Sequence, residues 1–197
     1  MKILNASLIS CLLLTGCALD TEHYRNNSPE FKFESFFNGK LCAKGLVRAR
    51  NGQVNRKFTA EIMAYSSATQ VRLEEVFLFG DGEQQKRDWE FNEIDKGWQG
   101  TANDVIGIAQ GEIFGDSLHL TYQLKINVEN DEYIVAMDDW LHLIDDSTLM
   151  GSTEMTKWGV NVGRIDIVIQ KDSSISSDNM IQKDKSRVSS CIADLDL

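Results

Sequence analysis

The chain lacks an apolar run long enough to cross a bilayer as a helix. Such a helix needs about 20 apolar residues. The N-terminal run from Ile3 to Leu14 has about a dozen before Thr15 and Gly16 interrupt it. This length argues against a retained membrane helix and favours a segment that is cleaved.

Familiar catalytic and cofactor motifs are also missing. The sequence has no G-x-G-x-x-G, phosphate loop, G-x-S-x-G elbow or H-E-x-x-H spacing. Of its three histidines, His119 and His142 fall near Asp138 on one face of adjacent predicted strands. Three such residues suffice for a metal ion, but a solvated outer face explains them more simply. We therefore predict no cofactor and no metal.

Positive charge is scarce and scattered. The chain has 20 basic and 30 acidic residues, a formal charge of −10. Removal of residues 1–16 leaves 181 residues with a charge of −11, because Lys2 is lost and no acid is. We expect no binding to nucleic acid, which requires a clustered basic surface, and anionic lipid surfaces are disfavoured for the same reason.

The clearest positive signal is Leu14-Thr15-Gly16-Cys17, which follows Lys2 and the apolar run. It is the pattern of a bacterial lipoprotein signal, in which cleavage occurs just before the cysteine. We predict a signal peptide over residues 1–16 and acyl chains on Cys17, an almost permanent bilayer anchor. Ala18 follows, rather than the aspartate that often retains lipoproteins in the inner membrane. We expect the periplasmic face of the outer membrane, with the inner membrane as the alternative.

The rest of the chain divides into three parts. Residues 17–30 are the acylated cysteine and a polar tether with the only proline, residues 31–171 one domain, and residues 172–197 a polar tail that we expect to be disordered. Cys42 and Cys191 remain after the signal and anchor are assigned. In an oxidising compartment they either pair or remain separate thiols.

Within the domain, apolar residues alternate with polar ones, which predicts strands. The fold expected is all-β, an antiparallel meander of about nine or ten strands closing into a lipocalin-like barrel. Besides a short helix near residues 30–37, the expected strands are 41–49, 58–64, 71–79, 85–91, 97–101, 104–112, 117–127, 132–144, 149–157 and 163–170.

Charged residues fall on the apolar, inward face of this barrel. A turn at Glu129-Asn130 places Asp139 opposite Leu120. The same register forms four apolar or aromatic pairs: Leu118 with Leu141, Tyr122 with Met137, Leu124 with Val135 and Ile126 with Tyr133. Pairing across Asp81-Gly82-Glu83 sets Glu75 opposite Trp89, with Arg87 one diagonal away. Buried charges need partners. Glu75, Arg87, Trp89 and Asp139 therefore form either an internal ion-paired cluster that fixes register or the polar centre of a ligand site.

An ordered set of short motifs runs through the domain, including Phe36-Phe37-Asn38-Gly39-Lys40-Leu41, Arg87-Asp88-Trp89, Asp138-Asp139-Trp140 and Lys157-Trp158-Gly159. Taken in this order, the motifs resemble a family of Gram-negative lipoproteins known as domain of unknown function 3833. The resemblance covers about residues 31–171 and implies a single-domain lipoprotein without an established activity. Genes of such proteins often lie near those for cyclopropane-type fatty-acid modification, which implies a lipid-related role.

Three functions are compatible with these features. The first is a barrel that binds a lipid or other apolar small molecule, its polar end at Glu75, Arg87 or Asp139. The second is an enzyme acting on modified fatty acids or phospholipids, with Asp139 or Glu75 as acid or base. The third is an envelope structural or assembly factor with a solid barrel and an exposed Asp138, Trp140 and His142 face. We favour the binding protein.

Overall fold

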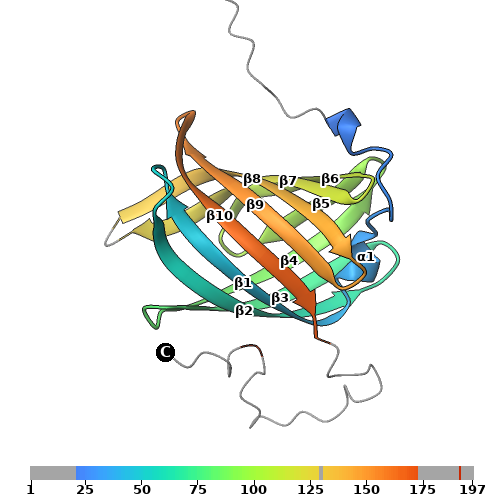
Figure 1. The fold of residues 1–197 in the computed structure, drawn as a ribbon, viewed down its shortest axis with the longest axis horizontal. Coiled ribbons are helices and arrows are strands. Elements are labelled where there is room, and N and C mark those ends of the chain that lie inside the picture. Colours follow the sequence, from blue (N-terminus) through green and yellow to red (C-terminus); the bar gives the residue numbers. More distant parts are fainter. Residues whose placement is uncertain (1–20, 129–130, 173–190, 192–197) are drawn as a thin grey trace, which may run out of the picture.

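The computed structural model describes residues 21–128, 131–172 and 191. Ten antiparallel strands follow one another around a closed barrel, and β1 pairs with β10 to complete it (Figure 1). The predicted all-β meander is therefore confirmed. The strands are β1 (Gly39–Ala49), β2 (Val54–Ser66), β3 (Gln70–Phe79), β4 (Gln84–Ile94), β5 (Gly97–Ala102), β6 (Val105–Phe114), β7 (Ser117–Val128), β8 (Asp131–Asp145), β9 (Thr148–Lys157) and β10 (Val160–Lys171).

The register between β7 and β8 is the predicted one. Leu118 lies opposite Leu141, Leu124 opposite Val135, and Asp139 opposite Leu120. A slip of one residue would turn the apolar side chains of either strand toward solvent, so the buried interior fixes this pairing.

The predicted register between β3 and β4 is wrong by two residues. Glu75 lies opposite Arg87, and Leu73 lies opposite Trp89. The hairpin loop begins one residue earlier than expected, because Phe79 N–H donates to the Glu83 carbonyl at 2.9 Å. Gly82, at φ 87°, then occupies the left-handed position that three-residue hairpin loops require. A shift of two residues preserves the faces, so Glu75 and Arg87 still point inward.

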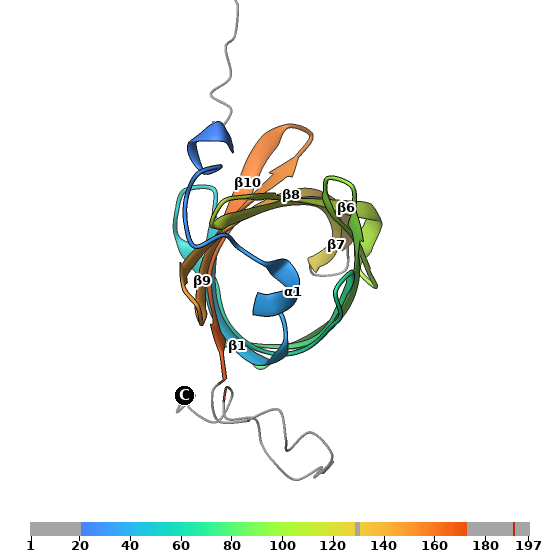
Figure 2. The ribbon, with the colours of Figure 1, turned by 90° about the vertical axis from the view of Figure 1, so that its right-hand side faces the viewer.

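A short helix closes one end of the barrel. The 3₁₀ helix η1 (Thr21–His23) lies outside the wall, and the chain then enters α1 (Phe33–Phe36), which fills one barrel opening in Figure 2. Its neighbourhood is aromatic: Phe33 lies 5.0 Å from Phe91 and 4.9 Å from Trp98, measured between ring centroids. We call this the plugged end, and the opposite end, where β1 turns into β2 and β9 into β10, the mouth.

The two halves of the barrel differ in packing. The half near α1 holds a continuous buried cluster that includes Phe31, Leu41, Ile62 and Trp98. A smaller buried cluster of Leu124, Val135 and Met137 lies in the mouth half. Several other side chains on the inward-facing positions of this half are only half-buried: Val47, Phe77, Val105, Ile126, Tyr133, Met155 and Ile165. The mouth half is therefore less tightly filled than the plugged half.

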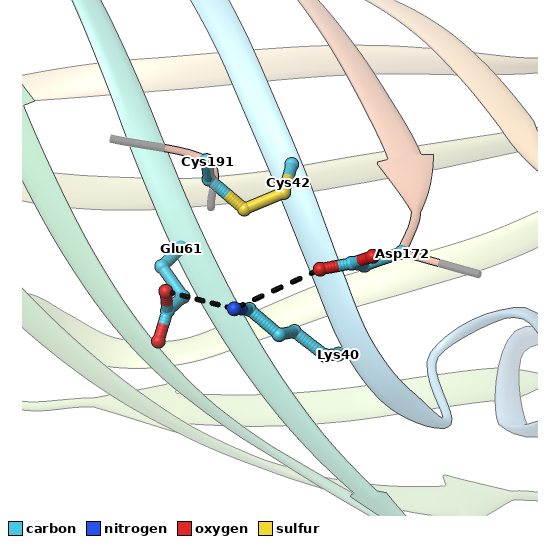
Figure 3. Close-up of a disulfide and its surroundings, with 5 residues drawn as sticks. All are labelled: Lys40, Cys42, Glu61, Asp172 and Cys191. Atoms are coloured by element: carbon cyan, nitrogen blue, oxygen red, sulfur yellow. Dashed lines mark ion pairs between the residues drawn. A yellow bond between two sulfur atoms is a disulfide. The ribbon is translucent and has the colours of Figure 1, made fainter. Parts of the chain in front are cut away.

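A disulfide joins Cys42, on the outer face of β1, to Cys191 (Figure 3). Their Cα atoms are 5.6 Å apart, within the usual range for such bridges. Beside it, Lys40 Nζ lies 3.3 Å from Glu61 and 3.7 Å from Asp172. The disulfide holds Cys191 against the first strand, and the Lys40 ion pair holds Asp172 there.

Several predictions concern residues outside the described part. They are the signal peptide, Cys17 with the first residues of the tether, and the predicted tail apart from Asp172 and Cys191. In the part that is described, no helix has both the length and the apolar character needed to span a membrane.

Candidate functional site

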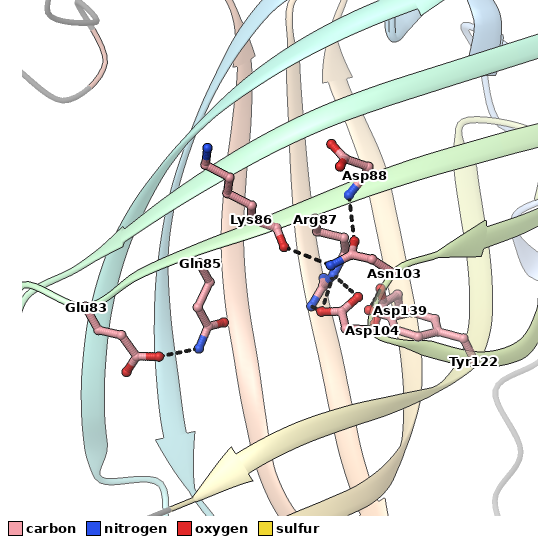
Figure 4. A network of polar contacts seen from close by, with 9 residues as sticks. All are labelled: Glu83, Gln85, Lys86, Arg87, Asp88, Asn103, Asp104, Tyr122 and Asp139. Carbon is pink, nitrogen blue, oxygen red and sulfur yellow. Dashed lines mark hydrogen bonds and ion pairs between the residues drawn. The ribbon is translucent and has the colours of Figure 1, made fainter.

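A partly buried ion pair anchors a polar cluster inside the barrel, toward the mouth. Arg87 on β4 donates from Nε to both carboxylate oxygens of Asp104 at 2.9 Å, and its Nη2 lies 2.8 Å from Oδ2 (Figure 4). Asp104 sits in the turn between β5 and β6. Asn103 fixes this turn to β4 by accepting from Asp88 N–H and donating to the Lys86 carbonyl. The turn therefore delivers the counter-ion that satisfies Arg87.

A second pair faces the same interior from β7 and β8. The Tyr122 hydroxyl donates to Asp139 Oδ2 at 3.1 Å. The other oxygen, Asp139 Oδ1, is buried and has no hydrogen-bond partner among the described residues. A buried acceptor without a donor is costly. Asp139 is therefore prepared to accept a hydrogen bond or to carry a proton.

Burial raises the pKa of both inward carboxyl groups. Desolvation raises the pKa of Glu75 to about 7, although Arg87 opposes the rise. Desolvation also raises the pKa of Asp139 to about 6, against the lowering effect of the Thr153 and Tyr122 hydroxyls. A carboxyl group with a pKa near neutrality exchanges protons at physiological pH. No hydrogen bond or ion pair within 4.0 Å joins Glu75 to another described side chain.

Arg87 and Tyr122, the other two members of the polar cluster, remain in their usual protonation states. Burial by itself lowers the pKa of Arg87, but Tyr122, Asp104 and Glu75 outweigh it and raise the pKa overall. Desolvation, followed by the charge of Asp139, holds the pKa of Tyr122 well above its usual value. Arg87 is a fixed cation and Tyr122 a neutral hydrogen-bond donor.

Three of the four predicted cluster residues, Glu75, Arg87 and Asp139, point into the barrel close enough for their charges to influence one another. Glu75 lies opposite Arg87 on the neighbouring strands β3 and β4. Arg87 lowers the pKa of Asp139. Arg87 also lowers the pKa of Tyr122, and Glu75 raises it. Trp89 instead belongs to the buried aromatic core. It stacks on Phe91 at 4.9 Å and meets Tyr122 edge-on at 5.3 Å.

Sequence reasoning missed three participants, Asp104, Tyr122 and Thr153. Tyr122 had been paired with Met137 as an aromatic member of the inner face, and that pairing is correct. Its hydroxyl was the available signal, since a buried tyrosine oxygen needs a partner. Asp104 lies in a turn whose direction the sequence does not reveal, and Thr153 meets Asp139 only through the β8–β9 register.

The prediction of an exposed Asp138, Trp140 and His142 face is wrong at its centre. Trp140 points outward but is only 8% exposed. Tyr24, in the segment after η1, packs against it at 5.4 Å, and His119 stacks on it at 4.3 Å. The tether residues thus cover the surface that had been considered for a partner.

The two outer histidines are engaged with neighbouring side chains. His119 Nε2 lies 2.9 Å from Asp138, and His142 Nδ1 lies 2.8 Å from the Ser117 hydroxyl. Over residues 21–128, 131–172 and 191, the one grouping with metal-ligand spacing is Cys42, Asp172 and Cys191. Its two sulfur atoms are bonded to each other.

Two grooves mark the outer wall. One, of about 660 Å³, is lined mainly by outward side chains of β1, β2, β9 and β10, including Leu46, Met150 and Val168. The other, of about 630 Å³, follows β6 to β9, where a bulge between Ile106 and Gln110 interrupts pairing with β7. The first is separate from the inward polar cluster, whereas the second is also lined by Tyr122 of that cluster.

The sequence matches, over residues 11–171, the family described as “Protein of unknown function (DUF3833)”. The chain belongs to this family. The match includes residue 17 and ends where β10 ends, so it extends the predicted resemblance toward the N-terminus. No curated protein matches the chain in sequence.

Solved structures that are similar to this DUF3833 protein include three chains. The crystal structure of Rv2717c from M. tuberculosis has a TM-score of 0.50 at 14% identity, over 75% of this chain and 99% of that one. The S-type phycobiliprotein lyase CPES from Guillardia theta gives 0.49 at 9% identity, over 73% and 92%. A redesigned barrel, mFAP1, bound to DFHBI, gives 0.40 at 8% identity, over 69% and 95%. At these identities the similarity concerns the fold alone.

Proposed function

We propose that this DUF3833 protein is a lipid-anchored envelope lipoprotein whose barrel binds a lipid or another apolar small molecule. The observation that carries the proposal is the contrast within the barrel interior. Half-buried apolar side chains of the mouth half surround a polar cluster in which the acceptor Asp139 Oδ1 is unpaired among the described residues. Binding sites of small molecules combine apolar walls with a few placed polar groups in this way.

The charges of the cluster favour a particular polar end. Asp104 already neutralises Arg87 through three short contacts, whereas Glu75 and Asp139 lie inside without a cation of their own. A ligand carboxylate would meet two acidic groups and an occupied arginine. A hydroxyl or an amine would instead donate to Asp139 Oδ1 and lower the cost of burying that carboxyl group. We therefore assign the ligand a hydrogen-bond donor at its polar end.

The proposed anchor rests on the sequence pattern at residues 14–17. Cys17 would become the first mature residue and carry the acyl chains, and Ala18 favours sorting to the periplasmic face of the outer membrane. Only Ala18, Leu19 and Asp20 separate Cys17 from Thr21, where η1 begins. An extended chain covers about 3.5 Å per residue, so the anchor would hold the barrel within about 15 Å of the lipid.

Mass spectrometry tests the two parts separately. We expect the N-terminal peptide of the purified protein to carry acyl chains on Cys17, and unmodified Cys17 would exclude the anchor. Native mass spectrometry of the detergent-purified chain, followed by organic extraction, should reveal a bound apolar compound with a hydroxyl or amine.

Substitutions locate the bound compound. Asp139→Asn places an amide beside Tyr122 and changes the group that receives the ligand donor, so we expect a lower occupancy. The matched control is Asp138→Asn, because Asp138 is the adjacent exposed residue and points outward toward His119. Equal occupancy in the two variants, or no added mass in the wild-type protein, would exclude binding at the polar cluster.

The pKa values of about 7 for Glu75 and about 6 for Asp139 favour one second candidate, an enzyme acting on the bound lipid. Such groups serve as general acids and bases near neutral pH. If the extracted compound changes its mass on prolonged incubation with wild-type protein but not with Glu75→Gln, the barrel is an enzyme. An unchanged compound supports binding without turnover.

A further inference from the structure

The tip of the β9–β10 hairpin carries a tryptophan in a conformation that bulky residues avoid. Trp158 has φ 52° and Gly159 φ 75°, so both turn residues lie in the left-handed region. Asparagine, aspartate or glycine normally occupies the first of these positions. The Trp158 side chain is 92% exposed, so burial in the barrel does not account for it.

Apolar neighbours extend this exposed surface. Val160 and Val162 follow on β10, exposed by 47% and 41%, and Val162 lies in a bulge between Asn161 and Gly163. Val54, at the start of β2, is also exposed. The β1–β2 hairpin is adjacent because Ala49 pairs with Gly163 at the closure of the barrel.

The same two hairpins concentrate positive charge. Residues 47–58 and 153–166 together hold six basic and two acidic residues, in a chain whose net charge is −10. Arg48 and Arg164 share Asp166, and Arg56 binds Asp81 and Glu83. Within the described ranges, no carboxylate lies within 4.0 Å of Arg50, Lys57 or Lys157.

Lys157 links the charge to the aromatic tip. Its Nζ lies 3.7 Å from the ring centroid of Tyr133 and 4.6 Å from that of Trp158. The closure of the barrel, which joins the first strand to the last, thus produces a basic, aromatic and aliphatic surface. The scattered charges of the sequence had argued against any such surface.

We propose that Trp158, Val160 and Val162, with Arg50 and Lys157, form a docking surface for an anionic phospholipid bilayer. Tryptophan favours the region between head groups and acyl chains, and lysine and arginine near the surface are attracted to anionic lipid. Docking would involve the rim of the mouth, formed by the β1–β2 and β9–β10 hairpins, and does not require a ligand in the interior.

The orientation of the N-terminal segment agrees with this surface. In both Figure 1 and Figure 2, η1 and the tip of the β9–β10 hairpin project from the same side of the barrel. η1 lies toward the plugged end and the hairpin at the mouth, so a bilayer on that side meets both. The barrel would then be held at two points with its axis along the membrane.

The fluorescence of Trp158 itself can report whether this surface docks on a bilayer. The other three tryptophans, Trp89, Trp98 and Trp140, are no more than 8% exposed. The full chain is reconstituted into vesicles of phosphatidylethanolamine and phosphatidylglycerol, with or without bromine on the acyl chains. We expect brominated lipid to quench the emission of Trp158 and vesicles to protect it from acrylamide in the water.

Two variants serve as controls. Trp158→Phe should remove the quenched component, and any quenching that remains reports brominated lipid near Trp89 or Trp98 inside the barrel. Trp158→Phe combined with Tyr65→Trp moves the reporter to the plugged end of β2, where Tyr65 is 42% exposed. This relocated tryptophan should stay accessible to acrylamide.

The contribution of Arg50 and Lys157 to docking can be measured separately. Arg50→Gln and Lys157→Gln should each lower the ratio of docked to undocked Trp158 roughly fivefold and weaken its dependence on phosphatidylglycerol. Equal acrylamide quenching with and without vesicles would overturn the proposal. So would protection that occurs only in native membranes, because it would indicate a protein partner. Interior binding can fail while rim docking holds, and the two outcomes are read from different tryptophans.

Discussion

The plugged half and the mouth half of one barrel treat their interior in opposite ways. Around α1 most inward positions carry aromatic and aliphatic side chains that are almost fully buried, and a few such as Leu141 and Leu143 are half-buried. In the mouth half many are half-buried, and two carboxyl groups with raised pKa values lie among them. The first arrangement stabilises the fold. The second costs stability, as expected of a site that serves a function, and it agrees with the ligand binding proposed above.

The largest expected effect contrasts one phenylalanine from each half. Phe33→Ala removes a ring packed between Phe91 and Trp98 and should lower the free energy of unfolding by about 3–5 kcal/mol. Phe77→Ala, at a half-buried position near the mouth, should cost about 1–2 kcal/mol. Urea unfolding monitored by circular dichroism measures both. Equal losses would mean that the halves are packed alike.

A smaller effect should depend on pH. The folded protein holds protons on Glu75 and Asp139 up to about pH 7 and about pH 6, whereas the unfolded chain releases them near 4.5 and 3.8. The unfolded state therefore binds fewer protons in this window, and these two groups make stability fall as pH rises. Relative to wild type, Glu75→Gln/Asp139→Asn should gain about 3.5 kcal/mol between pH 5 and 7.

The control for this profile uses the neighbours on the opposite face. Glu74→Gln/Asp138→Asn alters the same residue types one position earlier on each strand, outside the barrel. Its stability relative to wild type should not rise along the same curve. A parallel rise in both variants would show that net charge, rather than the interior of the mouth half, is responsible.

The Arg87–Asp104 pair allows a double-mutant cycle inside the mouth half. Arg87→Gln leaves Asp104 without its ion-pair partner and should cost about 2 kcal/mol at pH 8. It should also raise the pKa of Glu75 further, because the nearby positive charge of Arg87 lowers that pKa. Adding Asp104→Asn should restore part of the loss, with a coupling of about 1 kcal/mol in guanidinium unfolding. Strictly additive losses would show that the two side chains do not act as a pair.

The sequence predicted the β-barrel well because alternation and apolar cross-strand pairs constrain it locally. The β7–β8 register followed from four such pairs, and inward Glu75, Arg87 and Asp139 followed from strand parity. The β3–β4 register failed because the predicted loop 81–83 would place Glu83 in the left-handed third position. The loop 80–82 places Gly82 there instead, which costs less strain.

Contacts between distant segments could not be obtained in this way. Asp104 reaches Arg87 from a turn, Tyr24 covers Trp140 from the tether, and the basic rim forms only when β1 closes on β10. None of these contacts corresponds to a repeating pattern or a fixed spacing in the sequence. Alternation along a strand assigns each side chain to the inner or outer face, but its partner on that face depends on how the barrel closes in three dimensions.

The smallest effect concerns the disulfide, which lies outside both halves. In the unfolded chain, the Cys42–Cys191 bond closes a loop of 149 residues. In the folded protein Asp172 is already held beside β1, so the bond closes only the 19 residues from 172 to 191. Because closure entropy grows as the logarithm of loop length, Cys42→Ser/Cys191→Ser should cost about 2 kcal/mol or less.

This loss arises mainly in the unfolded state, so the difference between Phe33→Ala and Phe77→Ala should persist when both are measured in the serine background. If the difference shrinks there, the disulfide also contributes to packing in the plugged half.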